Sequence, residues 1–416
     1  MPCHFTPQFY ISNLVIDNMK FAKKTKAILY GMEFTHGIRR AFMSALALLY
    51  FLSFGFNLVS ITTLFAISTL IMVLFEFPTG AIADYDSRKK SLMISFILLS
   101  IAFFGLFVFD KFWLLAGSWI LGDIAWTFSS GANSAWAIDA LKYAKEKSKI
   151  INLISRGYLF EKSGYVIGGL IGFIIVSISF KLIWLIVSLS NFAMFLIIWK
   201  YMEERNFKPT KTPNNFIIKS LIKAKESFSF ILHVKNKELK VLLIAGIFSV
   251  ITVASFFVSV PLLFTEKFGI TPEKISAIYA IVGILAIGSP IIAEKMSNKF
   301  GFRKSLFSLF ILISLSIIIF TFSKSIIITI VILGVLCILL AGSDVIQDSA
   351  YHNEFDSKIR ASLSSLSSVL FATTSSITIF FTGLGIKFIG LENTLILSGV
   401  MGLFTSMICL IGLKKD

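Results

Sequence analysis

Charged, metal-binding and nucleophilic residues are scarce in this chain of 416 residues. Asp, Glu, Lys and Arg make up 15% of it, whereas a soluble domain has about a quarter. The 3 cysteines and 4 histidines lack the spacing of a disulfide framework, a metal site or a catalytic triad. The sequence also has no Gly-x-x-x-x-Gly-Lys phosphate-binding loop, which argues against ATP-driven pumping. We therefore expect no enzymatic activity, no catalytic residues, no bound metal and no cofactor.

Apolar residues take the place of the missing charge. They make up 56% of the chain, Phe alone occurs 44 times, and the mean hydropathy is +0.85. They occur in about twelve blocks of roughly 20 residues, the length that a helix needs to cross a bilayer core. The pattern predicts an all-α membrane protein with twelve transmembrane helices. The approximate blocks are residues 27–53, 57–83, 90–109, 112–139, 156–179, 181–201, 240–264, 273–295, 303–322, 325–349, 360–386 and 391–412.

The blocks form two halves of six, separated by the longest polar stretch of the sequence. We expect one bundle at residues 27–202 and a second at residues 240–416. Residues 203–239 are predicted to be a cytoplasmic linker with a short amphipathic helix on the membrane surface. Residues 1–26 are predicted to be a cytoplasmic amphipathic segment.

The net charge of +16 indicates membrane orientation rather than nucleic-acid binding. When both chain ends are placed in the cytoplasm, almost all Lys and Arg residues fall in the tails and inward loops, as the positive-inside rule requires. We expect a multi-pass protein of the plasma membrane that contacts lipid and has no nucleic-acid partner. The outward loops hold only Lys111, Lys181, Lys267, Lys274, Lys324 and Lys387.

The most specific motif is a charged turn between the second and third blocks. It reads Gly-x-x-x-Asp-x-x-x-Arg-Lys, with Gly80, Asp84, Arg88 and Lys89 at the fixed positions. This turn resembles the loop signature of the major facilitator superfamily of secondary transporters, with two other positions of that signature changed. A weaker echo, residues 298–304, lies at the corresponding place in the second half. The resemblance implies two six-helix pseudo-repeat bundles, a monomer, and a substrate site at the midplane between the halves.

The resemblance also implies roles for the charges of this loop. In the superfamily, an acid at the cytoplasmic end of the fourth helix pairs with the signature arginine, which here gives Asp139 and Arg88. The signature aspartate, here Asp84, caps a helix of the opposite half, an arrangement that the helix dipole favours. These charges would close a gate when the cavity faces outward. The alternative is that they only set the topology.

Three charged residues lie near mid-depth in the predicted membrane helices. Arg39 and Arg40 are in the first block and Asp123 is in the fourth. Charges inside a bilayer are costly and mark functional sites. The resemblance implies that these two helices are neighbours, so an ion pair that a proton or substrate perturbs is expected; the alternative is a fixed internal salt bridge. Glu33, nearer the cytoplasm on the face of Arg40, either extends a proton path or meets interfacial water.

Three further residues are candidates for the transport pathway. Trp126, at mid-depth in the fourth block, either stacks on a flat substrate or contacts lipid. Asp344 and Asp348 lie one turn apart near the inner end of the tenth block. They are either solvated groups at a helix end or a proton or cation site, since two nearby carboxylates favour protonation of one of them.

These features favour a proton-coupled exporter, an antiporter that moves a small molecule by alternating access and draws on the proton gradient. The glycines of the fifth block, at residues 164–172, are similar to the glycine-proline motif of exporters in the family, without its proline. The alternative is an importer or uniporter of a nutrient or an organic anion on the same fold. Two arginines against one acid at mid-depth are typical of an anionic substrate.

Overall fold

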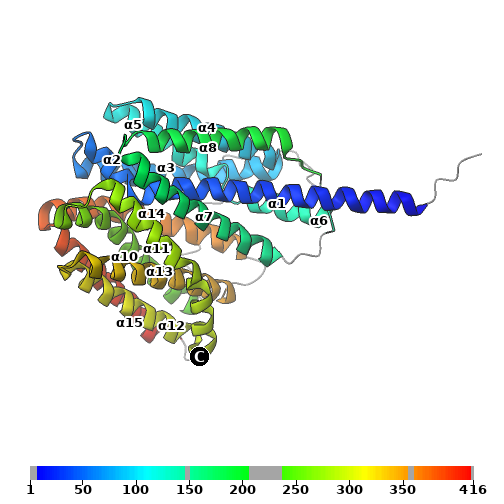
Figure 1. Ribbon diagram of the computed structural model, residues 1–416. Helices are drawn as coiled ribbons and strands as arrows, with labels where there is room; N and C mark the ends of the chain where they lie inside the picture. Colours follow the sequence, from blue (N-terminus) through cyan, green and yellow to red (C-terminus); the bar gives the residue numbers. More distant parts are fainter. Residues whose placement is uncertain (1–6, 146–149, 206–236, 355–359, 414–416) are drawn as a thin grey trace, which may run out of the picture.

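The computed structural model describes residues 7–145, 150–205, 237–354 and 360–413, and every regular element in these ranges is a helix. The predicted all-α class is therefore confirmed. Of the predicted linker, residues 206–236 lie outside the described part of the chain, as does the amphipathic helix expected there. Figure 1 shows two groups of helices that lie against each other, the first half above the second.

The first half contains eight helical segments that make six crossings. The first crossing breaks at Leu46, between α1 and α2, and the fourth breaks between α5 and α6, where Gly131 has a φ of 74°. Only glycine adopts such a φ readily. The segments are α1 (Pro7–Ala45), α2 (Ala47–Ser53), α3 (Leu58–Tyr85), α4 (Arg88–Val108), α5 (Phe112–Thr127), α6 (Ala132–Tyr143), α7 (Ile150–Val176) and α8 (Leu182–Tyr201).

The second half repeats this order. Gly301, with φ 76° and ψ 162°, divides α12 into the end of one crossing and the whole of the next. The elements are α10 (Lys237–Phe268), α11 (Pro272–Leu285), the 3-10 turn η1 (Ala286–Gly288), α12 (Ser289–Phe322), α13 (Ile326–Glu354), α14 (Arg360–Ile389) and α15 (Leu391–Gly412). Nine helices of the described ranges are long and apolar enough to span a membrane. The broken crossings, α1–α2, α5–α6 and α11 with the start of α12, are consistent with a total of twelve.

Helix α1 is longer than a membrane crossing needs. Its 39 residues extend over roughly 60 Å at 1.5 Å per residue, about twice the thickness of a bilayer core. Part of the expected N-terminal segment is therefore a straight continuation of the first membrane helix, visible at the right of Figure 1. We call the side of the bundle with both chain ends the terminal side, and the other the opposite side.

The halves meet along two helix pairs, α3 with α14 and α7 with α11. Glycines allow this close approach: a Cβ added to Gly383 would lie 1.9 Å from Thr62 Oγ1, and one on Gly169 would lie 2.8 Å from Ala280 Cβ. Ser276 donates a hydrogen bond of 2.9 Å to the carbonyl of Gly169. These contacts lie toward the opposite side, so the two halves are held together there.

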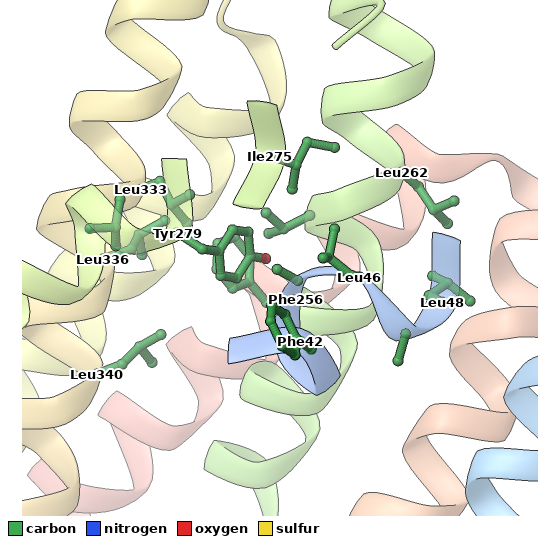
Figure 2. Close-up of a cluster of buried hydrophobic side chains, with 14 of the residues drawn as sticks. Phe42, Leu46, Leu48, Phe256, Leu262, Ile275, Tyr279, Leu333, Leu336 and Leu340 are labelled. Atoms are coloured by element: carbon green, nitrogen blue, oxygen red, sulfur yellow. The ribbon is translucent and has the colours of Figure 1, made fainter. Parts of the chain in front are cut away.

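An apolar cluster strengthens the same closure (Figure 2). Phe42 and Leu46 of the first half contact Phe256 and Tyr279 of the second, and all four are buried. Leucines of α13 complete the cluster beside Tyr279. We call these side chains the plug. The plug and the close glycine contacts together hold the two halves against each other on the opposite side.

Candidate functional site

A cavity that contains several charged residues lies between the halves, next to the plug. It has two adjoining lobes, of about 650 Å³ and about 570 Å³. Helices of both halves line each lobe, so a bound molecule would touch both bundles at once. The residues common to the two lobes are Met43, Ser44, Asp123, Val253, Phe257 and Asp344.

Arg40 lines the second lobe and forms an ion pair. Its Nη1 lies 2.6 Å from Glu161 Oε1 on α7, and 53% of its side chain is exposed. A half-exposed charge at mid-depth requires water, because lipid would not solvate it. Nearby, Glu33 accepts a hydrogen bond of 2.7 Å from the amide of Asn133, which links α1 to α6. Arg40 is therefore exposed to the space of the second lobe.

Arg39, the neighbouring residue, has a different environment. It is only 5% exposed and also lines the second lobe. Its guanidinium carbon lies 4.1 Å from the ring centre of Trp126, in the range of a cation–π contact. Its Nε has no hydrogen-bond partner, and in the described part of the chain no carboxylate lies within 4.0 Å of it. Arg39 is therefore a buried cation that makes no close ion pair with a described residue.

Trp126 also contacts His36. The two rings meet edge to face at 4.7 Å, and His36 Nε2 lies 3.3 Å from the hydroxyl of Ser129. The residue predicted to contact substrate or lipid thus supports Arg39 and borders the cavity. Trp119, seven residues earlier, packs instead among the rings of Phe51 and Phe65.

Asp123 faces both lobes and has a serine partner. Ser68 of α3 donates a hydrogen bond of 2.5 Å to its Oδ2. Among the described residues, neither Arg39 nor Arg40 lies within ion-pair distance of it. The expected arginine–aspartate pair is thus not formed in this conformation, although the three residues border one lobe. The role of Asp123 in transport stays a prediction.

Asp344 lines both lobes from α13, and its role stays a prediction. The side chains of Asp348 and Asp84 are outside the described part of the structure. A Cβ added to Gly80 would meet no described atom within 4 Å. The signature glycine is therefore not required by packing in this conformation.

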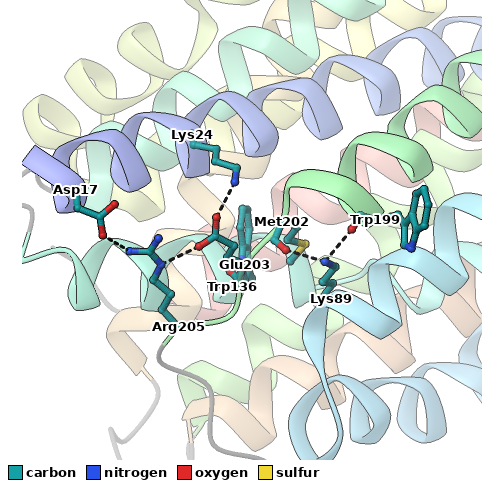
Figure 3. A network of polar contacts seen from close by, with 8 residues as sticks. All are labelled: Asp17, Lys24, Lys89, Trp136, Trp199, Met202, Glu203 and Arg205. Atoms are coloured by element: carbon teal, nitrogen blue, oxygen red, sulfur yellow. Dashed lines mark hydrogen bonds and ion pairs between the residues drawn. The ribbon is translucent and has the colours of Figure 1, made fainter.

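The signature loop is fixed to its own half. Arg88 Nη1 lies 2.5 Å from Asp139 Oδ2, which is the pairing that the family resemblance implied. Lys89 Nζ donates hydrogen bonds to the carbonyls of Trp199 and Met202, at 2.9 Å and 2.8 Å (Figure 3). Lysine thereby caps the C-terminal end of α8, where the helix dipole favours a cation.

A second network on the terminal side was not expected from the sequence. Arg205 bridges Asp17 of α1 and Glu203, each at 2.8 Å, and Lys24 lies 2.6 Å from Glu203 (Figure 3). The hydrogen bond from Lys24 lowers the pKa of Glu203 below its usual value. The network joins the extension of α1 to the segment after α8, and its partners are too far apart in sequence for spacing to reveal.

Comparison with known proteins gives the family. The sequence model of the Major Facilitator Superfamily matches residues 29–351. A search of curated protein sequences gave no match.

Solved structures of transporters share the fold. A POT family transporter in complex with 5-aminolevulinic acid has 14% identity and a TM-score of 0.77, with 93% of this chain and 95% of that one covered. The nucleoside transporter NupG has 13% identity and a TM-score of 0.73, with coverage of 95% and 100%. A D-xylose-proton symporter has 12% identity and a TM-score of 0.66, with coverage of 96% and 98%. With its two six-crossing halves, its central cavity and its signature loop, this chain belongs to the major facilitator superfamily.

Proposed function

We propose that this transporter couples the movement of a small molecule to a proton gradient by alternating access. The observation that carries the proposal is the cavity between the halves, which contains the acid Asp123 and is lined from both bundles. Transporters of this kind place substrate and coupling groups at the interface of their repeats near the membrane midplane. The neighbour described as a D-xylose-proton symporter is in keeping with proton coupling.

We propose further that the terminal side is cytoplasmic and that the protein acts as a monomer in the plasma membrane. The distribution of Lys and Arg supports this orientation through the positive-inside rule. In that orientation the cavity faces the cytoplasm and the plug closes the outer side. Transport then requires the plug to separate while the terminal ends of the two halves come together.

Asp123 is proposed as the carrier of the coupling proton. It faces the cavity from α5 and accepts one hydrogen bond, from Ser68. An intramembrane acid at such a place is a proton-relay candidate because its charged form is costly unless water or a cation stabilises it. Opening to one side would supply water to Asp123, and closure would remove it.

Export is the proposed direction. Its support is the glycine series of α7, which resembles the motif of exporters in the family. In the structure these glycines allow tight packing: a Cβ on Gly164 would lie 2.1 Å from the carbonyl oxygen of Phe34, and one on Gly172 would lie 2.2 Å from Ser276 Oγ. The second candidate is import of an organic anion, which is supported by Arg39, a buried cation with no carboxylate within 4.0 Å among the described residues.

The proposal is tested in pre-acidified inside-out vesicles that contain the protein. A panel of cationic, neutral and anionic compounds is added, and the internal pH is followed. We expect at least one compound to dissipate the pH gradient with the wild-type protein and not with Asp123→Asn. The mutant should insert normally and elute as the wild type in size-exclusion chromatography. A pH response in Asp123→Asn vesicles equal to that of the wild type would refute the role of Asp123.

The direction is tested with a responding compound in radiolabelled form. Export predicts that a proton gradient, acidic inside, drives its accumulation in inside-out vesicles. Accumulation in right-side-out vesicles with an acidic exterior would instead establish import. Compound flux that is insensitive to the pH gradient would establish a uniporter.

A further inference from the structure

We infer that Arg39 and Trp126 form the binding site for the anionic group of an amphipathic organic anion, a carboxylate or a phosphate ester. This inference rests on the proposed transport function and names the substrate class of the same cavity. It starts from the contrast between two adjacent arginines. Arg40 has a carboxylate partner at 2.6 Å, whereas Arg39 is more deeply buried and has none among the described residues.

A buried guanidinium without a counter-ion is costly, because burial removes its water without replacing it by a charge partner. Such a group is retained where a ligand supplies the missing charge. Arginine presents several N–H donors in a plane that matches a carboxylate or phosphate. In this structure the guanidinium carbon lies over the ring of Trp126, and the Nε donor has no hydrogen-bond partner among the described residues.

The guanidinium is also held in position before any ligand binds. Trp126 supports it at 4.1 Å, and His36 supports Trp126. His36 in turn is fixed by Ser129 and by the ring of Phe96, whose centre lies 5.2 Å away. A binding group with little freedom to lose gains affinity, since less entropy is lost on association.

The second lobe is lined by three cations, and two of them have no carboxylate close by among the described residues. Besides Arg39, Lys162 has no carboxylate within 4.0 Å among the described residues; its Nζ lies 4.9 Å and 5.9 Å from the ring centres of Tyr158 and Tyr165. Arg40 is paired with Glu161. The carboxylates of Asp123 and Asp344 also border this lobe, but neither lies within 4.0 Å of Arg39 or Lys162 among the described residues. The cations that remain without a carboxylate partner can therefore attract a negative group.

The rest of the cavity selects an apolar body. Most residues of the first lobe are apolar or aromatic, among them Phe65, Trp119 and Phe257. Tyr279, from the second half, borders the second lobe and has a buried hydroxyl without a hydrogen-bond partner (Figure 2). An anion at Arg39 with an apolar body in the first lobe would therefore contact both halves.

The test is equilibrium binding to the purified protein in lipid nanodiscs, with no pH gradient. The probes are benzoate, phenyl phosphate, the neutral analogue benzyl alcohol and the cationic analogue benzylammonium. We expect saturable binding of at least one of the two anions, and at least about tenfold weaker binding of the neutral and cationic analogues. Charge-assisted hydrogen bonds of the expected strength correspond to about a tenfold change in affinity or more.

Arg39→Gln should weaken binding of that anion at least about tenfold. Arg39→Lys should recover only part of it, since lysine keeps the charge without the planar donors. The matched control is Arg156→Gln, which removes one positive charge from an exposed position of α7 outside the cavity lining. Thermal unfolding of each variant without probe shows whether it is folded. If Arg39→Gln is not folded, the binding measured with Arg39→Lys decides the test.

Each outcome decides for or against the inference. The anion site is refuted if neither anion binds, if benzyl alcohol or benzylammonium binds as tightly as the anions, or if the folded Arg39 variants bind the anion as the wild type does. A failure of proton coupling has a separate signature, because anion binding would persist while the vesicle pH stays constant. Conversely, proton-coupled flux of cations without anion binding would leave the proposed function standing and refute this site.

Discussion

The two halves of the chain repeat one fold but differ in where they hold charge. In the cavity, the first half contributes Arg39, Arg40, Asp123 and Lys162, whereas the second contributes Asp344 among mostly apolar side chains. The plug and the helix pairs between the halves use residues of both. The comparison teaches that binding chemistry and closure are distributed differently. Closure needs two complementary surfaces, whereas a charged site can lie on one bundle.

The charged loops of the two halves share one kind of contact and differ in another. In the first half, Lys89 donates to carbonyls at the end of α8. In the second half, Arg303 donates to the carbonyl of Leu410 near the end of α15, with its Nε at 3.0 Å. Each loop thus ties its last helix with a basic side chain. The loop of the first half has, in addition, the ion pair between Arg88 and Asp139.

The largest effect is expected at the acids of the cavity. Asp123→Asn should reduce pH-driven accumulation of substrate by about 100-fold or more, the scale of lost proton transfer by a positioned group. Asp344→Asn should have the smaller effect. Radiolabelled uptake in vesicles, with insertion measured in parallel, compares the two variants. If only Asp344→Asn loses proton coupling, the second half carries the proton. The contrast between the two halves would then be wrong.

The next effect concerns the surface that both halves build. Gly383→Ala should destabilise this conformation by about 1–3 kcal/mol, the usual cost of overpacking, because the new Cβ would overlap Thr62. Gly117→Ala is the control, since its Cβ would meet no described atom within 4 Å. Thermal unfolding in detergent measures both. Equal stability of the two variants would contradict the close contact between α3 and α14.

A smaller effect is expected for the loops. Arg88→Ala should slow turnover about tenfold, equivalent to about 1.4 kcal/mol, with substrate affinity nearly unchanged, because the residue is proposed to act in gating. Arg303→Ala removes only the contact to Leu410 and should slow turnover less. Initial rates over a range of substrate concentrations separate turnover from affinity. If Arg88→Ala weakens binding and leaves turnover intact, the gate assignment is wrong.

The smallest effect is expected from the network on the terminal side of the first half. Lys24→Gln should cost roughly 0.5 kcal/mol at pH 7, since both side chains of the pair are more than one third exposed and such pairs are weak. Because Lys24 lowers the pKa of Glu203 from 4.5, the contribution is present above about pH 4.5 and is lost as the pH falls through the lower folded value.

Unfolding midpoints of wild type and Lys24→Gln at several pH values test this prediction. Their difference should shrink below pH 4.5 and also at high salt, because salt screens exposed charges. The matched variant in the second half is Lys267→Gln, which removes an ion pair of 2.8 Å with Glu392. A difference that grows on acidification would contradict the assignment to Glu203.

Much of the fold could be predicted because membrane helices are encoded locally. Blocks of about 20 apolar residues require no knowledge of their neighbours to be recognised as spans. The breaks were less visible. The fourth crossing was expected as one helix over residues 112–139, but the structure divides it around Gly131. The break at Leu46 has no glycine or proline at the site, and packing in the plug accompanies it.

The sequence predicted which charged residues border the site, but not which side chains they contact. Sequence depth singled out Arg39, Arg40 and Asp123, which do border one lobe. It gave no sign that Arg40 would pair with Glu161, or that Asp123 would accept a hydrogen bond from Ser68. These partners are supplied by α7 and α3, and no pattern within α1 or α5 reports their position.

The sequence by itself determined the all-α class, the order of the apolar helices and the signature loop. Only the tertiary structure decided which charged side chains have a close partner of opposite charge. Arg39 and Arg40 are adjacent, yet successive residues of a helix point about 100° apart. One therefore faces Trp126 of α5 and the other Glu161 of α7. The two arginines have different partners because those partners belong to helices that are distant in sequence and adjacent in space.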